Sequence, residues 1–214
     1  MNNNFIIISQ RHQKNQYGDY TDSLENTYLD YFRKLGYRIF PISNIETDIE
    51  DIVNAINPKK IILSGGDDVN PQLYGREYIE GSHISVYRDI TEAKLIDIAI
   101  KKNIELLGIC RGMQFINVYF GGKLIQNIEQ ELNIKGHNKG NKHKIKITEN
   151  IQLEDVDIND VVNSYHNSGI TKKIIGKNLK IFATDENGII VEGIYHEKYN
   201  IKGIQWHPER KQKL

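Results

Sequence analysis

Short apolar runs alternate with longer amphipathic stretches through the first half of the chain. Apolar runs of strand length are typical of buried strands, and apolar residues at helical spacing are typical of packed helices. The expected strands are 5–9, 37–42, 60–63 and 106–109, and the expected helices are 24–35, 49–56, 88–102 and 111–120. This alternation predicts a parallel sheet with helices on both faces.

The pattern changes after Lys123, where short apolar runs follow one another without long helices. Glu186-Asn-Gly188 is typical of a hairpin turn, because Asn-Gly accepts positive φ. The strands expected in this half are 123–126, 144–148, 180–184, 189–195 and 201–206. With no internal repeat or low-complexity linker, residues 1–214 are expected to form one α/β domain. It should have three αβα layers, a mostly parallel central sheet and extra antiparallel strands.

Polar segments between these elements are assigned to caps and loops. Asp22 is expected to cap the first helix, with Glu25 three residues later, and Gly36 to end it. A polar loop containing Tyr17-Gly-Asp-Tyr20 should precede that helix. The long polar segment 67–85 is expected to lie over a ligand crevice, where functional loops are common.

Composition narrows the class of protein. Lys+Arg and Asp+Glu each number 28, so the net charge is zero, and bulk charge predicts neither a nucleic-acid partner nor an acidic membrane. A single cysteine rules out an intramolecular disulfide and fits a reducing compartment. The sequence shows no signal-peptide pattern and no apolar run of membrane-spanning length, so a cytoplasmic protein is expected.

That one cysteine, Cys110, stands between an expected strand and an expected helix. Gly108 and Gly112 flank it in the pattern Gly-x-Cys-x-Gly, which is a nucleophile-elbow pattern with sulfur in place of a hydroxyl. The turn would place the thiol at a helix N-terminus, whose partial positive charge favours thiolate. A small buried hydrophobe is the alternative for a lone cysteine.

The ends of two further expected strands carry groups whose chemistry complements the Cys110 thiol. His207 and Glu209 follow the expected strand 201–206, so a turn can bring the carboxylate to the ring that would accept the thiol proton. A structural histidine beside a loop proline is the alternative. The expected strand at 60–63 runs into Gly65-Gly66, whose backbone can face an oxyanion at the carboxyl edge of the sheet.

Three motifs together resemble the class I glutamine amidotransferase superfamily. They are Leu63-Ser-Gly-Gly66, Gly108-Ile-Cys-Arg-Gly-Met-Gln114 and Gln205-Trp-His-Pro-Glu209. The resemblance implies a flavodoxin-like fold of that type.

Within the superfamily the sequence looks most like the free-standing gamma-glutamyl hydrolases, of the gamma-glutamyl-GABA hydrolase type. The features that indicate this branch are Gly65-Gly-Asp-Asp-Val-Asn-Pro71, Tyr74-Gly75, Arg88-Asp89, Cys110-Arg111-Gly112 and Asn163-Ser-Tyr-His166. Gamma-glutamyl-CDP-amidate hydrolase of capsular phosphoramidate synthesis is a narrower hypothesis.

The resemblance implies hydrolysis of a small-molecule gamma-glutamyl amide without metal or cofactor. Cys110 is the expected nucleophile, His207 the acid–base partner and Glu209 the group that orients His207. The backbone N–H groups of Gly66 and Arg111 are the expected oxyanion hole.

The same resemblance implies the substrate contacts. Gln114 is expected at the glutamyl α-substituents, and Ser164 and Tyr165 are expected to offer backbone groups there. His166 is predicted either to contact the amine half or to be structural. Arg88 is left between binding a substrate carboxylate and pairing with Asp89 or Glu92 on its own helix. The basic run His137–Lys144 is either a solvated loop or a contact for a phosphate or carboxylate on the substrate.

Two other function classes share parts of this pattern. A glutaminase subunit that passes ammonia to a separate synthetase would have the same triad. A non-enzymatic binding or sensing protein of the same fold is the second alternative. Only Arg210-Lys-Gln-Lys-Leu follows Glu209, so the last turn is expected either to be loosely packed or to be covered by another subunit, and a homodimer is one such arrangement.

Overall fold

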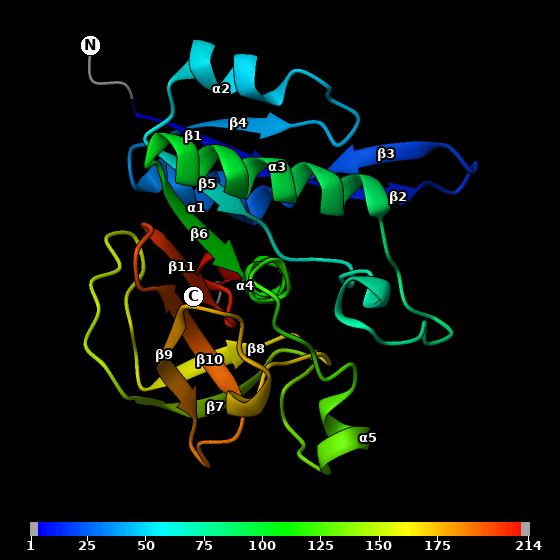
Figure 1. The fold of residues 1–214 in the computed structure, drawn as a ribbon, viewed down its shortest axis with the longest axis vertical. Coiled ribbons are helices and arrows are strands. Elements are labelled where there is room, and N and C mark those ends of the chain that lie inside the picture. Colours follow the sequence, from blue (N-terminus) through cyan, green and yellow to red (C-terminus); the bar gives the residue numbers. More distant parts are fainter. Residues whose placement is uncertain (1–3, 211–214) are drawn as a thin grey trace.

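A nine-stranded sheet forms the centre of the molecule in the computed structural model, which describes residues 4–210 (Figure 1). Its strands are β1 Phe5–Ser9, β4 Arg38–Ile42, β5 Lys60–Leu63, β6 Glu105–Ile109, β7 Asn141–Ile147, β8 Val161–Ser164, β9 Leu179–Asp185, β10 Val191–His196 and β11 Ile201–Ile204. They lie in the order β4-β1-β5-β6-β11-β10-β9-β7-β8. Neighbours from β4 to β11 are parallel, and neighbours from β11 to β8 are antiparallel. The expected α/β fold, with a mostly parallel central sheet and extra antiparallel strands, is confirmed.

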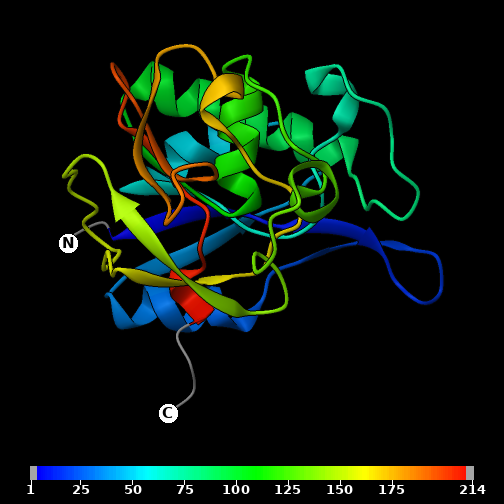
Figure 2. The same ribbon diagram turned by 90° about the horizontal axis from the view of Figure 1, so that it is seen from below.

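Helices cover both faces of the parallel half. They are α1 Asn26–Lys34, α2 Ile49–Ile56, α3 Val86–Lys102 and α4 Arg111–Tyr119, with the short α5 Ile128–Leu132 further along the chain. Ile7 packs in the core formed with α2, α3 and α4, whereas Ile6 and Ile8 pack in the core formed with α1. Successive strand residues point to opposite faces, so one apolar strand supplies both layers. Figure 2 shows α1 on one face of the sheet and α3 and α4 on the other. None of the helices within residues 4–210 is long and apolar enough to span a bilayer.

The three sequence motifs meet at one edge of this sheet. Gly108 of β6 pairs with Leu63 of β5 on one side and with Gly203 of β11 on the other. The segments that follow these strands, at Gly65, Cys110 and His207, therefore leave the sheet side by side. Parallel strands end at the same edge, which is where ligand crevices form in such sheets.

A hairpin replaces the polar loop expected after β1. It pairs β2 Arg11–Lys14 with β3 Tyr20–Ser23. The expected cap Asp22 lies in β3, and its carboxylate accepts hydrogen bonds from Ser43 Oγ at 2.7 Å and Asn44 N at 2.9 Å. The cap prediction was wrong because donors about twenty residues away occupy the oxygens that a local cap would need.

The second half of the chain contains two other differences. The segment 123–126 was expected as a strand, but it contributes a single bridge from Ile125 to Gly169, and α5 follows it. Strand β8 lies where no strand was expected. The predicted hairpin turn joins β9 to β10, where Gly188 N donates to Asp185 O at 3.0 Å. Pairing with distant strands decides these short elements, because their own patterns are weak.

The chain beyond β11 forms the short turn η3 Pro208–Arg210. Glu209 in this turn is 6% exposed, so it is packed into the protein. Residues 211–214 lie outside the described part of the chain, and the prediction that another subunit covers this end stays a prediction.

Candidate active site

Cys110 occupies the single position between β6 and α4. Its φ of 53° and ψ of −104° are sparsely populated for a non-glycine residue and typically cost about 1–3 kcal/mol. The elbow is possible because Gly112 lacks a side chain: a Cβ there would lie 2.2 Å from the carbonyl oxygen of Leu63. A Cβ on Gly108 would likewise lie 2.5 Å from the backbone of Gly112. The glycines therefore let β5, β6 and α4 approach closely enough to hold the thiol in a strained turn.

His207 and Glu209 form the second part of the site. His207 Nδ1 lies 2.5 Å from Glu209 Oε1, and both side chains are buried. A carboxylate on Nδ1 makes that nitrogen the donor and leaves Nε2 for proton exchange with the thiol. The ring enters through the space left by Gly65, where a Cβ would lie 2.7 Å from His207 Cε1.

The pKa of His207 is raised to about 9. Burial lowers it, but the charge of the Cys110 thiolate, a hydrogen bond with that sulfur and the Glu209 carboxylate outweigh burial. The imidazolium form is thus favoured at neutral pH beside the sulfur.

Asn163 holds the backbone of His207 in place. Its Nδ2 donates to His207 O at 2.8 Å, and His207 N donates to its Oδ1 at 2.9 Å. The sequence marked Asn163 only as the first residue of the motif that ends at His166. Its positioning role depends on a contact across 44 residues, and no local pattern could have indicated it.

Arg88 lies beneath the loop that begins at Gly65. Its Nη2 donates to the carbonyl oxygens of Ser64 at 2.7 Å and Gly65 at 3.0 Å, while its Nε donates to Glu92 at 2.9 Å. Of the alternatives for Arg88, the intrahelical pair with Glu92 is confirmed. Because Arg88 holds both carbonyls, it orients the peptide that leads into Gly66, the expected oxyanion donor.

The Arg111 side chain belongs to the same buried network. It pairs with Glu92 and, at 2.5 Å, with Asp89, and it is 1% exposed. Its backbone N–H begins α4 directly after Cys110. The guanidinium thus anchors α4 to α3, and the oxyanion role assigned to the backbone of Arg111 stays a prediction.

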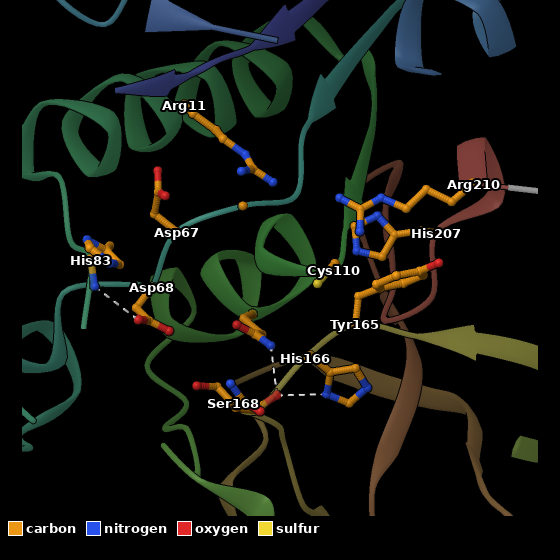
Figure 3. A pocket seen from close by; sticks show the side chains of 13 residues that line it. Arg11, Asp67, Asp68, His83, Cys110, Tyr165, His166, Ser168, His207 and Arg210 are labelled. Atoms are coloured by element: carbon orange, nitrogen blue, oxygen red, sulfur yellow. Dashed lines mark hydrogen bonds between the residues drawn. The ribbon is translucent and has the colours of Figure 1, made fainter. Parts of the chain in front are cut away.

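A cavity of about 300 Å³ opens above Cys110 (Figure 3). The expected site residues that line it are Gly66, Cys110, Gln114, Tyr165, His166 and His207. Charged side chains of both signs also line it, namely Arg11, Asp67, Asp68 and Arg210, together with the imidazole of His83. The cavity brings the thiol, the acid–base histidine and groups for both ends of a zwitterion into one space.

Ser164 is not brought to this cavity. It is fully buried, its Oγ donates to His137 O at 2.7 Å, and its carbonyl accepts from Gly140 N at 2.9 Å. These bonds join β8 to the neighbouring loop, so the structure gives Ser164 a different setting from the expected one.

One wall of the cavity stacks Arg210, which the motifs did not indicate, on two residues of the motifs, Tyr165 and His207. The guanidinium of Arg210 lies 4.5 Å from the centre of the Tyr165 ring, and that ring meets His207 edge-on at 5.5 Å. Glu25 holds Arg210 through both carboxylate oxygens at 2.8 Å and also binds Arg11 at 2.6 Å. The residue expected to support a helix cap thus positions two arginines at the cavity.

Gln114 faces the cavity but is held by the protein. Its Nε2 donates to Ser168 O at 2.9 Å and to Gln205 Oε1 at 3.3 Å, while Gln205 Nε2 lies 3.5 Å from Cys110 Sγ. The glutamine of the Gln205-Trp-His-Pro-Glu209 motif is therefore a neighbour of the sulfur.

His166 also lines the cavity, with its ring buried. Nδ1 donates to Ser168 O at 2.9 Å, and burial lowers the pKa of His166 to about 4, although Glu192 opposes that shift. The ring is neutral at physiological pH, and its Nε2 is left with a lone pair.

Comparison with known proteins identifies the family of the chain. The family model described as peptidase C26 matches residues 6–209. The chain belongs to the peptidase C26 family. Peptidase C26 proteins are part of the class I glutamine amidotransferase-like group, and membership supports a hydrolase or amidotransferase activity.

Individual relatives of this peptidase C26 protein carry several names. It is 33% identical over 192 residues to a putative glutamine amidotransferase-like protein of Lactococcus lactis, covering 86% of this chain and 79% of that one. It is 31% identical over 156 residues to the gamma-glutamyl-CDP-amidate hydrolase of Campylobacter jejuni, covering 73% of this chain and 64% of that one. A glutamine amidotransferase from Thermotoga maritima shares the fold, with a TM-score of 0.63 and 16% sequence identity. The match covers 98% of this chain and 77% of that one.

Proposed function

We propose that this protein hydrolyses a gamma-glutamyl amide through a thioester on Cys110, releasing glutamate and a free amine. The observation that carries the proposal is the alignment, in one cavity, of a strained Cys110 with a His207 whose Nδ1 is held by Glu209 at 2.5 Å. A thiolate paired with an oriented imidazolium is suited to acyl transfer.

In the first half of the reaction the Cys110 sulfur forms a bond to the γ-carbonyl carbon. The resulting oxyanion is stabilised by the backbone N–H groups of Gly66 and Arg111, and each such donor is typically worth ~10²–10³ in rate. The C–N bond then breaks as the His207 imidazolium gives its proton to the leaving nitrogen, which departs as the amine.

The second half regenerates the enzyme. Neutral His207 takes a proton from water as the water oxygen bonds to the thioester carbon, and the C–S bond breaks. Glutamate leaves, and the thiolate and imidazolium are restored, so the cycle balances without a cofactor or an oxidant.

Charged groups of the cavity support recognition of the glutamyl half. Asp67 lines the cavity and its carboxylate is suited to accept from an α-ammonium, although its Oδ2 also lies 3.8 Å from Arg88 Nη1. Arg11 and Arg210, which line the same cavity, are suited to an α-carboxylate. A site built to bond such groups rejects analogues that lack them, because its own polar atoms are then left unpaired.

The deciding experiment measures glutamate release from a panel of gamma-glutamyl amines, including gamma-glutamyl-GABA and gamma-glutamyl-CDP-amidate, with free glutamine alongside. Mass spectrometry of the quenched protein should detect a glutamyl adduct on Cys110. Cys110→Ala should lose more than about 10⁴-fold in turnover and form no adduct, because the chain contains no other cysteine.

Other outcomes point to the two other function classes. Efficient hydrolysis of free glutamine, stimulated by a partner protein, would replace the proposal with a glutaminase role. Absence of turnover and of adduct across the whole panel would leave a binding protein. Turnover retained by Cys110→Ala would reject the assigned nucleophile.

A further inference from the structure

Three histidines surround one buried carboxylate on the antiparallel side of the catalytic cavity. Glu192 of β10 is fully buried, and its Oε1 lies 3.1 Å from His143 Nε2, 3.5 Å from His137 Nδ1 and 3.9 Å from His166 Nε2. The rings of His137 and His143 have centroids 4.6 Å apart, and those of His137 and His166 are 5.2 Å apart. The proposed hydrolysis uses none of these four side chains as an acid, base or nucleophile.

The spacing of the ligand atoms fits a tetrahedral metal ion. The nearest ligand atoms of His137, His143 and Glu192 all lie within 4.8 Å of one another; His166 lies outside that group, with its Nε2 3.9 Å from Glu192 Oε1. Two ligands bound at about 2.0–2.1 Å to a tetrahedral Zn²⁺ are separated by about 3.3 Å, close to the distances measured from Glu192. Small rotations of the side chains would equalise these separations around one centre.

The hydrogen bonding around the cluster also favours a bound metal ion. His137 Nδ1, His166 Nε2 and Glu192 Oε2 are buried atoms without a hydrogen-bond partner, a costly arrangement unless another group satisfies them. His166 donates a hydrogen bond from Nδ1 to Ser168 O. Its Nε2 therefore keeps a lone pair that can bind a metal ion beside Glu192. Metal-binding histidines commonly have their second nitrogen fixed by a backbone carbonyl in this way.

We propose that His137, His143, His166 and Glu192 bind one divalent transition-metal ion of the Zn²⁺ class. Imidazole and carboxylate ligands suit such an ion, and four protein ligands leave no open position for chemistry, so the ion is structural. This inference goes beyond the proposed hydrolysis and does not depend on it.

The ion would stiffen one wall of the catalytic cavity. The carbonyl of His137 already accepts from His166 N at 2.8 Å, and the carbonyl of Ser168 accepts from both His166 and Gln114. A metal bound to both histidines would lock the loop carrying His137 to the loop after β8. Gln114 would then be held through Ser168 at the position where it faces the substrate cavity.

The test measures metal content and binding on full-length protein freed of any histidine tag. Protein purified without chelator should contain about one zinc per chain by plasma mass spectrometry. The apo protein, prepared by dialysis against a chelator, should bind Zn²⁺ one to one against a chromophoric competitor. Co²⁺ in its place should give the intense visible absorption of a four-coordinate site.

Two substitutions remove ligands, and two serve as matched controls. His143→Gln and Glu192→Gln should weaken Zn²⁺ binding by more than about 100-fold, since loss of an outer partner alone costs ~10–100-fold. His196→Gln removes a buried histidine elsewhere in β10, and Cys110→Ala removes the thiol; both should keep one ion per chain. Circular dichroism establishes that each variant is folded.

Three results would overturn the proposal. Wild-type apo protein that binds Zn²⁺ only substoichiometrically would show that the cluster is a histidine–carboxylate ion-pair network. Unchanged binding in the folded His143→Gln variant would place the ion elsewhere. Loss of binding in Cys110→Ala would assign the ion to the catalytic thiol.

Discussion

Cys110 and Glu209 together determine how far His207 stays protonated as the pH rises. The pKa of His207, about 9, exceeds the ordinary value of 6.5 because the Cys110 thiolate and Glu209 outweigh burial. A raised histidine pKa keeps the charged form present below 6.5 and through neutral pH, and that form is lost as the pH passes about 9. At the residue scale the reactive ion pair therefore has an alkaline limit.

The pH profile of kcat/KM should show that limit. Activity should fall as pH rises through about 9, because neutral His207 has no proton for the leaving amine. Glu209→Gln should move this limb to lower pH and reduce kcat, while substrate binding changes little. Steady-state kinetics across pH on both proteins measures the shift. An alkaline limb at the same pH in Glu209→Gln would mean that Glu209 does not support the charge on His207.

At the scale of elements, β7 connects the basic run to a second cavity. Lys139, Lys142 and Lys144 are all exposed, but Lys142 lines a cavity of about 480 Å³ that shares Tyr165 and Arg210 with the catalytic one. Successive residues of a strand point to opposite faces, so Lys142 and Lys144, two positions apart, share one face, and only their position along β7 separates them. If the substrate has a charged amine half, as the proposed hydrolysis allows, we expect that half to extend into this cavity.

Lys142→Ala should raise KM for a gamma-glutamyl amide whose amine carries a phosphate, with little change in kcat. The effect should weaken at high salt because screening reduces the attraction in the wild type. Lys144→Ala, on the same strand but outside the cavity, is the matched control and should leave KM unchanged. Equal KM values for both variants and the wild type would show that the basic run His137–Lys144 is a solvated surface without a role in substrate binding. Faster turnover of gamma-glutamyl-GABA than of any phosphorylated substrate would favour the uncharged amine.

Across the whole molecule, a buried charge network joins the parallel sheet to its helices. Glu92 of α3 accepts from Ser9 of β1 at 2.8 Å and from Arg88 at 2.9 Å, and it also binds Arg111 of α4. Burial alone would raise the pKa of Glu92, but Arg111 and Arg88 lower it. Because the folded-state pKa is lowered, the network stabilises the fold above the ordinary glutamate pKa, and that stability is lost as the pH falls.

Glu92→Gln should lower the free energy of unfolding by about 3–5 kcal/mol, because it leaves two buried guanidinium groups without their shared carboxylate. Urea unfolding followed by circular dichroism measures the loss, which should shrink as the pH is lowered. The control Glu50→Gln removes a pair with Lys101 on the surface and should have no measurable effect. A Glu92→Gln protein as stable as the wild type would show that the arginines find other partners.

Local patterns explain which elements could be predicted. The parallel strands and the helix Ile49–Ile56 were recognisable because short apolar runs and helical periodicity report burial directly. The β2–β3 hairpin and α5 were not, because polar residues form them and only their neighbours hold them. Asp22 failed as a cap for the same reason, since its partners, Ser43 and Asn44, come from another loop.

By itself, the sequence determined the α/β class, the elbow at Cys110 and the pairing of His207 with Glu209. The elbow and the pair each depend on residues within a few positions of one another, where spacing limits the geometry, and the α/β class depends on elements that are each recognisable from their own local pattern. Only the tertiary structure decided that Asn163 holds His207, that Glu25 positions Arg11 and Arg210, and that three histidines converge on Glu192. Those contacts join residues far apart in the chain, and the register of the strands between them decides which side chains meet.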